Sequence, residues 1–224
     1  MSSCLIKSRT AGTSGSRFFH LAGFLLLIFS TESAFTQRFF GELMAGAAGT
    51  QISGDELSGF NKAGIITGAG IRTSIHPKMD AGFRMLYFQK GSRRPLKNDG
   101  TDTAYYLLRL NYAEIPLTFR YRIRNQFLIE AGPSLGYLIS SYEENELGEL
   151  AFRRPFYNFD LSLTGSFVYE LSERMNFLFS YWQSLLPVRE HASGETYRLN
   201  QGQYSSVISF SLVYSLKRTA PGSE

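Results

Sequence analysis

Apolar and polar residues alternate along most of the chain from residue 38 onward, which is the pattern of a β-strand with one apolar and one polar face. The alternation is clearest in FYNFDLSLTGSFVYEL, residues 156–171, and it recurs at 127–139 and 204–216. Weaker but compatible runs occupy residues 38–50, 63–75, 79–91, 104–122 and 175–187. The pattern therefore predicts eight strands.

The fourth of these runs changes phase partway along. Leu108 and Tyr112 belong to one apolar phase, whereas Phe119 and Tyr121 belong to the other. The change falls at Glu114-Ile115-Pro116, and a proline inside a strand usually marks a bulge or an edge. We therefore expect a β-bulge at these three residues.

The connections between the runs alternate in length. Long polar connections cover residues 51–62, 92–103, 143–155 and 188–202, and short turns lie near His76-Pro77-Lys78, Arg124-Asn125 and Ser172-Glu173-Arg174. This regular order is typical of an up-and-down barrel with both termini on the short-turn side. The expected fold class is an all-β, eight-stranded antiparallel transmembrane β-barrel.

The choice between membrane and water depends on which strand face points outward. In an outer-membrane barrel the apolar face points outward, and the Gly- and Ser-rich polar face fits a narrow lumen. Aromatic residues also gather at strand ends, as in the girdles at bilayer interfaces: Tyr87, Tyr105, Tyr142, Tyr157 and Tyr181 towards the long connections, and Phe39, Tyr121, Phe127, Phe177 and Tyr214 towards the short turns. A secreted, lipocalin-like soluble barrel is the alternative.

The N-terminus has the composition of a secretory signal peptide. Lys7, Arg9 and Arg17 precede the apolar stretch 18–30, and small residues follow it. A short membrane anchor is the alternative. We expect a signal peptide at 1–36, with cleavage after residue 34 or 36, then an outer-membrane barrel at 37–217 and a short tail at 218–224.

Composition narrows the function classes. Aromatic residues make up 15% of the chain and charged residues 19%, and 21 glycines are present, which suits thin two-faced strands. The net charge of +4 falls to +2 once residues 1–34 are set aside, so no nucleic-acid partner is expected. The single cysteine, Cys4, precedes the apolar stretch, which leaves no disulfide or thiolate metal site in the mature chain.

Nine charged residues are predicted to face the lumen: Glu42, Arg72, Arg84, Arg109, Arg120, Arg122, Glu130, Asp160 and Glu170. They are expected to form an ion-pair network in which arginines and carboxylates neutralise each other inside a closed barrel. The alternative is a gate or a narrow ion path. Because eight strands leave an interior that side chains can fill, an open pore is not expected.

The sequence offers little for catalysis. Only His76 and His191 follow the signal segment, the first beside a short turn and the second in a long connection, so no catalytic, cofactor or metal site is predicted. The basic run 92–97 could meet anionic lipopolysaccharide and the acidic run 143–146 could meet cations, although runs of this kind are more often simply solvated.

Six segments resemble the PorT-like outer-membrane β-barrels of Bacteroidetes, which have the eight-stranded form of OmpA and OmpX: QISGDELSGFNKAG at 51–64, YFQKGSRR at 87–94, LRLNYAEIPLTFRYRI at 108–123, IEAGPSLGYLIS at 129–140, YELSERMNF at 169–177 and NQGQYSSVISFSLVYSL at 200–216. The resemblance implies an outer-membrane location and, for some members, a role in protein secretion. The tail KRTAPGSE after Leu216 departs from barrels that stop at the last strand.

The function expected from the resemblance is that of a non-enzymatic membrane component acting by interaction, as an accessory to secretion of proteins to the cell surface. The alternatives are a structural or adhesive barrel, a minor porin-like channel and a lipid-modifying enzyme. Expected partners are outer-membrane lipid and lipopolysaccharide, the barrel assembly machinery and secretion-system proteins, and no cofactor is expected.

Overall fold

A computed structural model describes residues 39–54, 59–94, 105–150, 155–190 and 202–216, and these form an all-β structure. The strands are β1 (Phe39–Ser53), β2 (Lys62–His76), β3 (Met79–Arg94), β4 (Tyr106–Arg122), β5 (Phe127–Asn145), β6 (Gly148–Glu149), β7 (Phe159–Glu170), β8 (Met175–Ser184) and β9 (Tyr204–Ser215). No helix in this part of the chain is long and apolar enough to cross a membrane.

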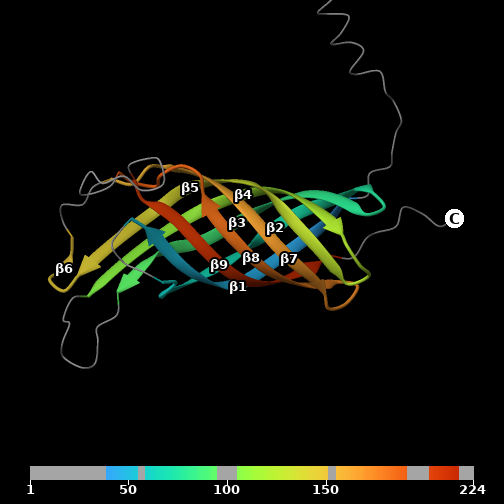
Figure 1. Ribbon diagram of the computed structural model, residues 1–224, viewed down its shortest axis with the longest axis horizontal. Helices are drawn as coiled ribbons and strands as arrows, with labels where there is room; N and C mark the ends of the chain where they lie inside the picture. Colours follow the sequence, from blue (N-terminus) through green and yellow to red (C-terminus); the bar gives the residue numbers. More distant parts are fainter. Residues whose placement is uncertain (1–38, 55–58, 95–104, 151–154, 191–201, 217–224) are drawn as a thin grey trace, which may run out of the picture. The chain divides into compact units, whose positions relative to one another are not determined.

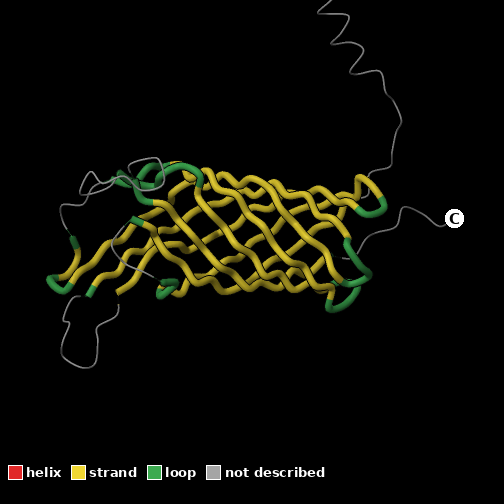
Figure 2. Tube along the Cα trace, viewed as in Figure 1, coloured by secondary structure: helices red, strands yellow, loops and turns green. Residues whose placement is uncertain are grey.

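Eight of the strands close into a barrel. Each long strand pairs antiparallel with the next one along the chain, and β9 pairs back onto β1, so the sheet has no open edge. The two-residue β6 only adds a short pairing to the end of β5. The strands cross the long axis obliquely (Figures 1 and 2). The predicted eight-stranded, antiparallel up-and-down barrel is therefore confirmed.

The apolar face of the barrel points outward. Large apolar side chains stay exposed along the outside of every long strand, including Phe167 at 69% and Leu135 at 48%, while serines such as Ser209 and Ser162 are buried inside. A soluble barrel has the reverse arrangement, with its apolar side chains inside. Here the polar side chains are kept away from hydrocarbon, and the backbone hydrogen bonds are satisfied between strands. Several residues of the expected aromatic girdles lie on this outer surface, among them Tyr121, Tyr157, Tyr181, Phe127 and Tyr214.

The bulge expected at Glu114-Ile115-Pro116 is wrong. Inward and outward residues alternate without interruption through this part of β4. The apolar phase changes because the apolar residues pass from the inward face to the outward face along the strand. The register shift between β4 and β5 lies closer to the long connections, where Asn111 pairs with Ser140 but Tyr112 pairs with Leu138. The extra residue, Ile139, is on β5.

Some boundaries also differ from those expected. Glu143, Glu144 and Asn145 belong to β5 rather than to a connection, because that strand continues past the register shift. The short turns fall as expected, with β2 ending at His76 and β3 beginning at Met79. The expected signal peptide and C-terminal tail, together with His191, lie outside the described residues.

Replacing Leu135 by arginine should strongly destabilise the barrel in lipid. Leu135 lies within the exposed apolar run on β5, where an arginine near the bilayer centre costs about 2–4 kcal/mol. Urea unfolding of the refolded protein in lipid vesicles would measure the loss. The matched control is Leu147→Arg, because Leu147 is 93% exposed in the turn beyond the apolar surface and should be neutral. Equal effects at the two positions would contradict a lipid-facing β5.

Candidate functional site

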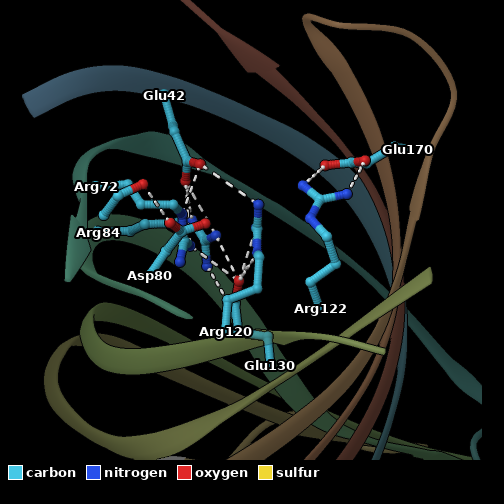
Figure 3. Close-up of polar contacts among 9 residues, drawn as sticks. Glu42, Arg72, Asp80, Arg84, Arg120, Arg122, Glu130 and Glu170 are labelled. Carbon is cyan, nitrogen blue, oxygen red and sulfur yellow. Dashed lines mark hydrogen bonds and ion pairs between the residues drawn. The ribbon is translucent and has the colours of Figure 1, made fainter. Parts of the chain in front are cut away.

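Five charged side chains form a cluster inside the barrel, towards its short-turn end (Figure 3). Consecutive strands β1 to β5 contribute Glu42, Arg72, Arg84, Arg120 and Glu130, each at most 4% exposed. The Glu130 carboxylate accepts a hydrogen bond from each arginine, at 2.9, 2.6 and 2.7 Å in strand order. Glu42 accepts from Arg72 Nε at 2.8 Å and from Arg84 Nε at 3.1 Å. We call this group the arginine cluster.

A second, more accessible ion pair lies beyond the arginine cluster at the short-turn mouth. Arg122 on β4 donates to both carboxylate oxygens of Glu170 on β7, at 2.6 and 2.7 Å. The two side chains are 38% and 27% exposed, so water screens this pair. Arg122, Glu170 and Arg120 help to line a cavity of about 520 Å³ at this end.

Apolar side chains fill the lumen above the arginine cluster. On β3 the inward positions run from Arg84 through Leu86 and Phe88, so these two apolar residues lie next along the axis. The Phe88 ring packs edge-on against Trp182 of β8, with ring centroids 5.3 Å apart. Buried residues from most strands belong to the same apolar cluster, which reaches the short-turn cavity at Leu128: Met44, Ala48, Ile66, Leu128, Val168, Leu178, Val207 and Val213.

A buried lysine with two carboxylates lies above the apolar layer. Lys90 Nζ is 2.9 Å from Glu114 Oε2 and 2.8 Å from Asp160 Oδ2, and all three residues are at most 1% exposed. Ser134 and Ser162 each donate a hydroxyl to Glu114 Oε1. The ammonium also lies over the rings of Phe88 and Tyr112, which adds cation–π attraction. We call Lys90, Glu114 and Asp160 the lysine cluster.

The long-loop end of the lumen is closed by a further apolar group and one ion pair. The apolar group consists of Ile52, Leu108, Leu110, Tyr112, Phe156 and Val188. Arg189 Nη1 donates to Glu143 Oε2 at 2.8 Å, and the guanidinium carbon lies 4.3 Å from the centre of the Phe156 ring. The same carboxylate accepts from the Tyr106 hydroxyl at 2.5 Å.

The structure brings eight of the nine predicted lumen residues into ion pairs, but not into one network. Five form the arginine cluster, Arg122 and Glu170 form a separate pair, and Asp160 contacts Lys90 instead of an arginine. Arg109 was placed wrongly. It is exposed between the fully buried Leu108 and Leu110, because the inward phase at this end of β4 is apolar.

Sequence reasoning missed five buried charged residues: Lys62, Lys90, Glu114, Glu143 and Arg189. Lys90 has the same parity as Arg84 on an uninterrupted β3, so strict alternation would have found it. Glu114 falls at the expected bulge, and Lys62 and Glu143 fall within expected connections although they belong to β2 and β5. Arg189 lies outside the long strands, in an isolated bridge with Gln203, and no periodicity marks such a position.

The charges of the two buried clusters are complementary. With every group ionised, the arginine cluster carries a net charge of +1 and the lysine cluster a net charge of −1. Each charge has close partners of opposite sign, which offsets the large cost of removing it from water. Together with the apolar layers, these contacts obstruct the lumen along its length.

Of the two histidines that follow the expected signal peptide, His76 is the one within the described residues. His76 ends β2, and its Nδ1 accepts only a long hydrogen bond, 3.4 Å, from the Lys78 backbone N–H. No group of three or more His, Cys, Asp or Glu residues there is arranged to hold a metal ion.

Changing Glu130 to glutamine should destabilise the barrel far more than the same change at Glu170. Glu130→Gln leaves three buried arginines sharing one carboxylate and should lower the free energy of unfolding by about 3–5 kcal/mol. Glu170→Gln breaks a half-exposed ion pair and should lower it by less than about 1 kcal/mol. Urea unfolding in lipid vesicles compares the two variants. Similar losses would mean that the arginine cluster is not the main electrostatic contact of the lumen.

Comparison with known proteins agrees with this geometry. Residues 20–190 match the family described as outer membrane protein β-barrel domain, and no curated protein matches the chain. Neisserial surface protein A is 11% identical, with a TM-score of 0.50 over 79% of this chain and 97% of that one. Ail, the attachment invasion locus protein of Yersinia pestis, solved with the heparin analogue sucrose octasulfate, is 10% identical, with a TM-score of 0.47 over 80% and 99%.

These low identities concern the fold alone, whereas the family match covers more than half of the chain. The closed barrel, its outward apolar surface and the polar lumen are the features that such a family requires. The chain therefore belongs to the outer membrane protein β-barrel domain family and is a protein of the outer membrane.

Proposed function

We propose that this protein is a non-enzymatic outer-membrane component that acts by interaction, as an accessory to the secretion of proteins to the cell surface. The secretion role is supported by the resemblance of six segments to PorT-like barrels, including YFQKGSRR at 87–94 and LRLNYAEIPLTFRYRI at 108–123. A resemblance of this kind is an associational argument, so the role needs a direct test.

The filled lumen is the observation that carries an interaction role. Two buried charge clusters, two apolar layers and the ion pair between Arg189 and Glu143 occupy the interior. A barrel whose interior is packed cannot pass solutes without rearranging, so contacts with other molecules fall to its outer surfaces.

One such surface is an extension formed by residues 89–94 of β3, 106–111 of β4 and 140–145 of β5. In Figure 1, β4 and β5 continue beyond β1 and β9 at the left end of the barrel. Its inner side is held by Leu108 and Leu110, which are fully buried, while its outer side carries polar residues. A sheet anchored in this way offers a rigid platform to a partner.

A narrow channel is the second candidate, favoured by the cavity of about 520 Å³ at the short-turn mouth. Because the arginine cluster lies directly above this cavity, we expect no steady conductance when the purified barrel is inserted into planar lipid bilayers. Stable, ohmic current steps from the folded protein, absent with heat-unfolded protein, would instead favour the channel.

Deleting the gene should cause particular exported proteins to accumulate in the periplasm and to disappear from the cell surface. The measurement is quantitative proteomics of periplasm, surface and medium in the parent and deletion strains. The wild-type gene should restore the parental distribution. A variant with residues 95–104, which connect β3 to β4, replaced by Gly and Ser should fail to do so.

Two controls make this test decisive. A variant with residues 55–58 replaced in the same manner shows whether any altered connection disrupts function, and a mobility difference between unboiled and boiled samples on denaturing gels shows that each variant is folded. Unchanged secretion in the deletion strain would refute the secretion role and leave a structural or adhesive barrel, which cell-adhesion and permeability assays can examine.

A further inference from the structure

Arg109 is a charged residue on the outward face of β4. Its neighbours in sequence, Leu108 and Leu110, are both 0% exposed inside the barrel, so the backbone of β4 is firmly anchored at this point. Strand alternation then directs the Arg109 side chain outward, where it is exposed. The guanidinium is therefore presented on the outer surface by a packed strand, not by a loop.

The height of Arg109 corresponds to the headgroup layer of the bilayer. The exposed apolar surface of β5 reaches Ile139, next to Ser140, and Ser140 pairs with Asn111. Arg109 is the next outward position beyond Asn111, about 7 Å further along the strand, or about 5 Å along the membrane normal for a strand tilted by roughly 45°. Polar headgroups occupy this zone at the edge of the hydrocarbon.

The surroundings of Arg109 favour an anion. Among the described residues Arg109 forms no ion pair, and its side chain is exposed. Arg93, two residues beyond Gly91, which pairs with Arg109, is also exposed. The acid on the same face is Glu144, which accepts a hydrogen bond from the Tyr142 hydroxyl at 3.1 Å.

Hydrogen-bonding groups border Arg109 on the side of the hydrocarbon. The Asn111 amide donates to the Ser140 hydroxyl at 2.8 Å on the outer surface. Gln89, which pairs with Asn111, donates to the Tyr87 hydroxyl at 3.1 Å. These neutral groups suit the sugar or hydroxyl part of a headgroup, while the cations suit its charge.

The corresponding zone on β8 and β9 is neutral. There the Gln183 amide oxygen accepts hydrogen bonds from Tyr181 and Ser206, both at 2.8 Å. Among the described residues, the outer side of β3 to β5 thus carries cations at this height and the outer side of β8 and β9 carries neutral groups. A barrel that contacted headgroups equally on all sides would not need cations on one side and neutral groups on the other.

We propose that the outward face of β3 to β5 around Arg109 binds a phosphorylated lipid headgroup of the outer leaflet. A guanidinium can donate two parallel hydrogen bonds to one phosphate, and the partial desolvation at a membrane interface strengthens that contact. Arg93, which is also exposed, adds attraction over a longer range. This proposal does not depend on the secretion role.

The test compares two lipid probes on the folded full-length mature barrel in detergent micelles. Native mass spectrometry measures binding of lipid A and of the same lipid A after its phosphate groups have been removed. The wild-type protein should prefer the phosphorylated form. Arg109→Gln should weaken its binding by about tenfold, and Arg109→Lys, which keeps the charge but not the fork of donors, should weaken it less.

Arg124→Gln is the matched control, because Arg124 is exposed in the turn between β4 and β5 at the opposite end of the barrel. It should bind lipid A as the wild type does, and each variant should keep the gel-mobility difference of a folded barrel. Equal binding of the two lipid forms by the wild type would overturn the proposal. So would an equal loss in Arg109→Gln and Arg124→Gln, or no loss in Arg109→Gln.

Discussion

The requirement that a narrow membrane barrel neutralise its own interior governs this structure. Because the outer surface faces hydrocarbon, the polar residues of every strand are directed into a lumen that has little room for water. Charges there must find partners of opposite sign from other strands, and Glu130 does so by accepting hydrogen bonds from three arginines. Closure of the sheet and assembly of these ion pairs are therefore coupled, since the partners meet only when β1 to β5 curve around the axis.

The same constraint explains the order of layers along the lumen. The arginine cluster carries one excess positive charge and the lysine cluster one excess negative charge, and an apolar layer around Phe88 and Trp182 separates them. On β4, towards the long-loop end, the inward side chains become apolar and the outward ones become polar. This inversion accounts for the exposed position of Arg109 and gives β3 to β5 an outer face that differs chemically from the lipid-facing part of the barrel.

Much of the lumen could be predicted because side-chain direction in a strand depends only on parity. Parity gives the inward direction of Glu42, Arg72, Arg84, Arg120 and Glu130, because each lies in a stretch of its strand where the alternation is uninterrupted. Prediction failed where apolar residues were assumed to mark the outer face throughout. On β4 that assumption turned a change of face into a bulge and placed Arg109 inside. Partners across the lumen, such as Lys90 and Asp160, are 70 residues apart, and local pattern carries no information on their contact.

The sequence alone determined the number of strands, the alternation of long and short connections, the closed antiparallel topology and the outward apolar face. These follow from a period of two residues and from the need to satisfy every backbone hydrogen bond in lipid. Only the tertiary structure decided which charges pair, where the lumen changes from polar to apolar and on which side of the sheet Arg109 lies. Those features depend on the stagger of neighbouring strands around the barrel and on the register shift opposite Asn111. Together these set the positions along the barrel axis of residues from different strands.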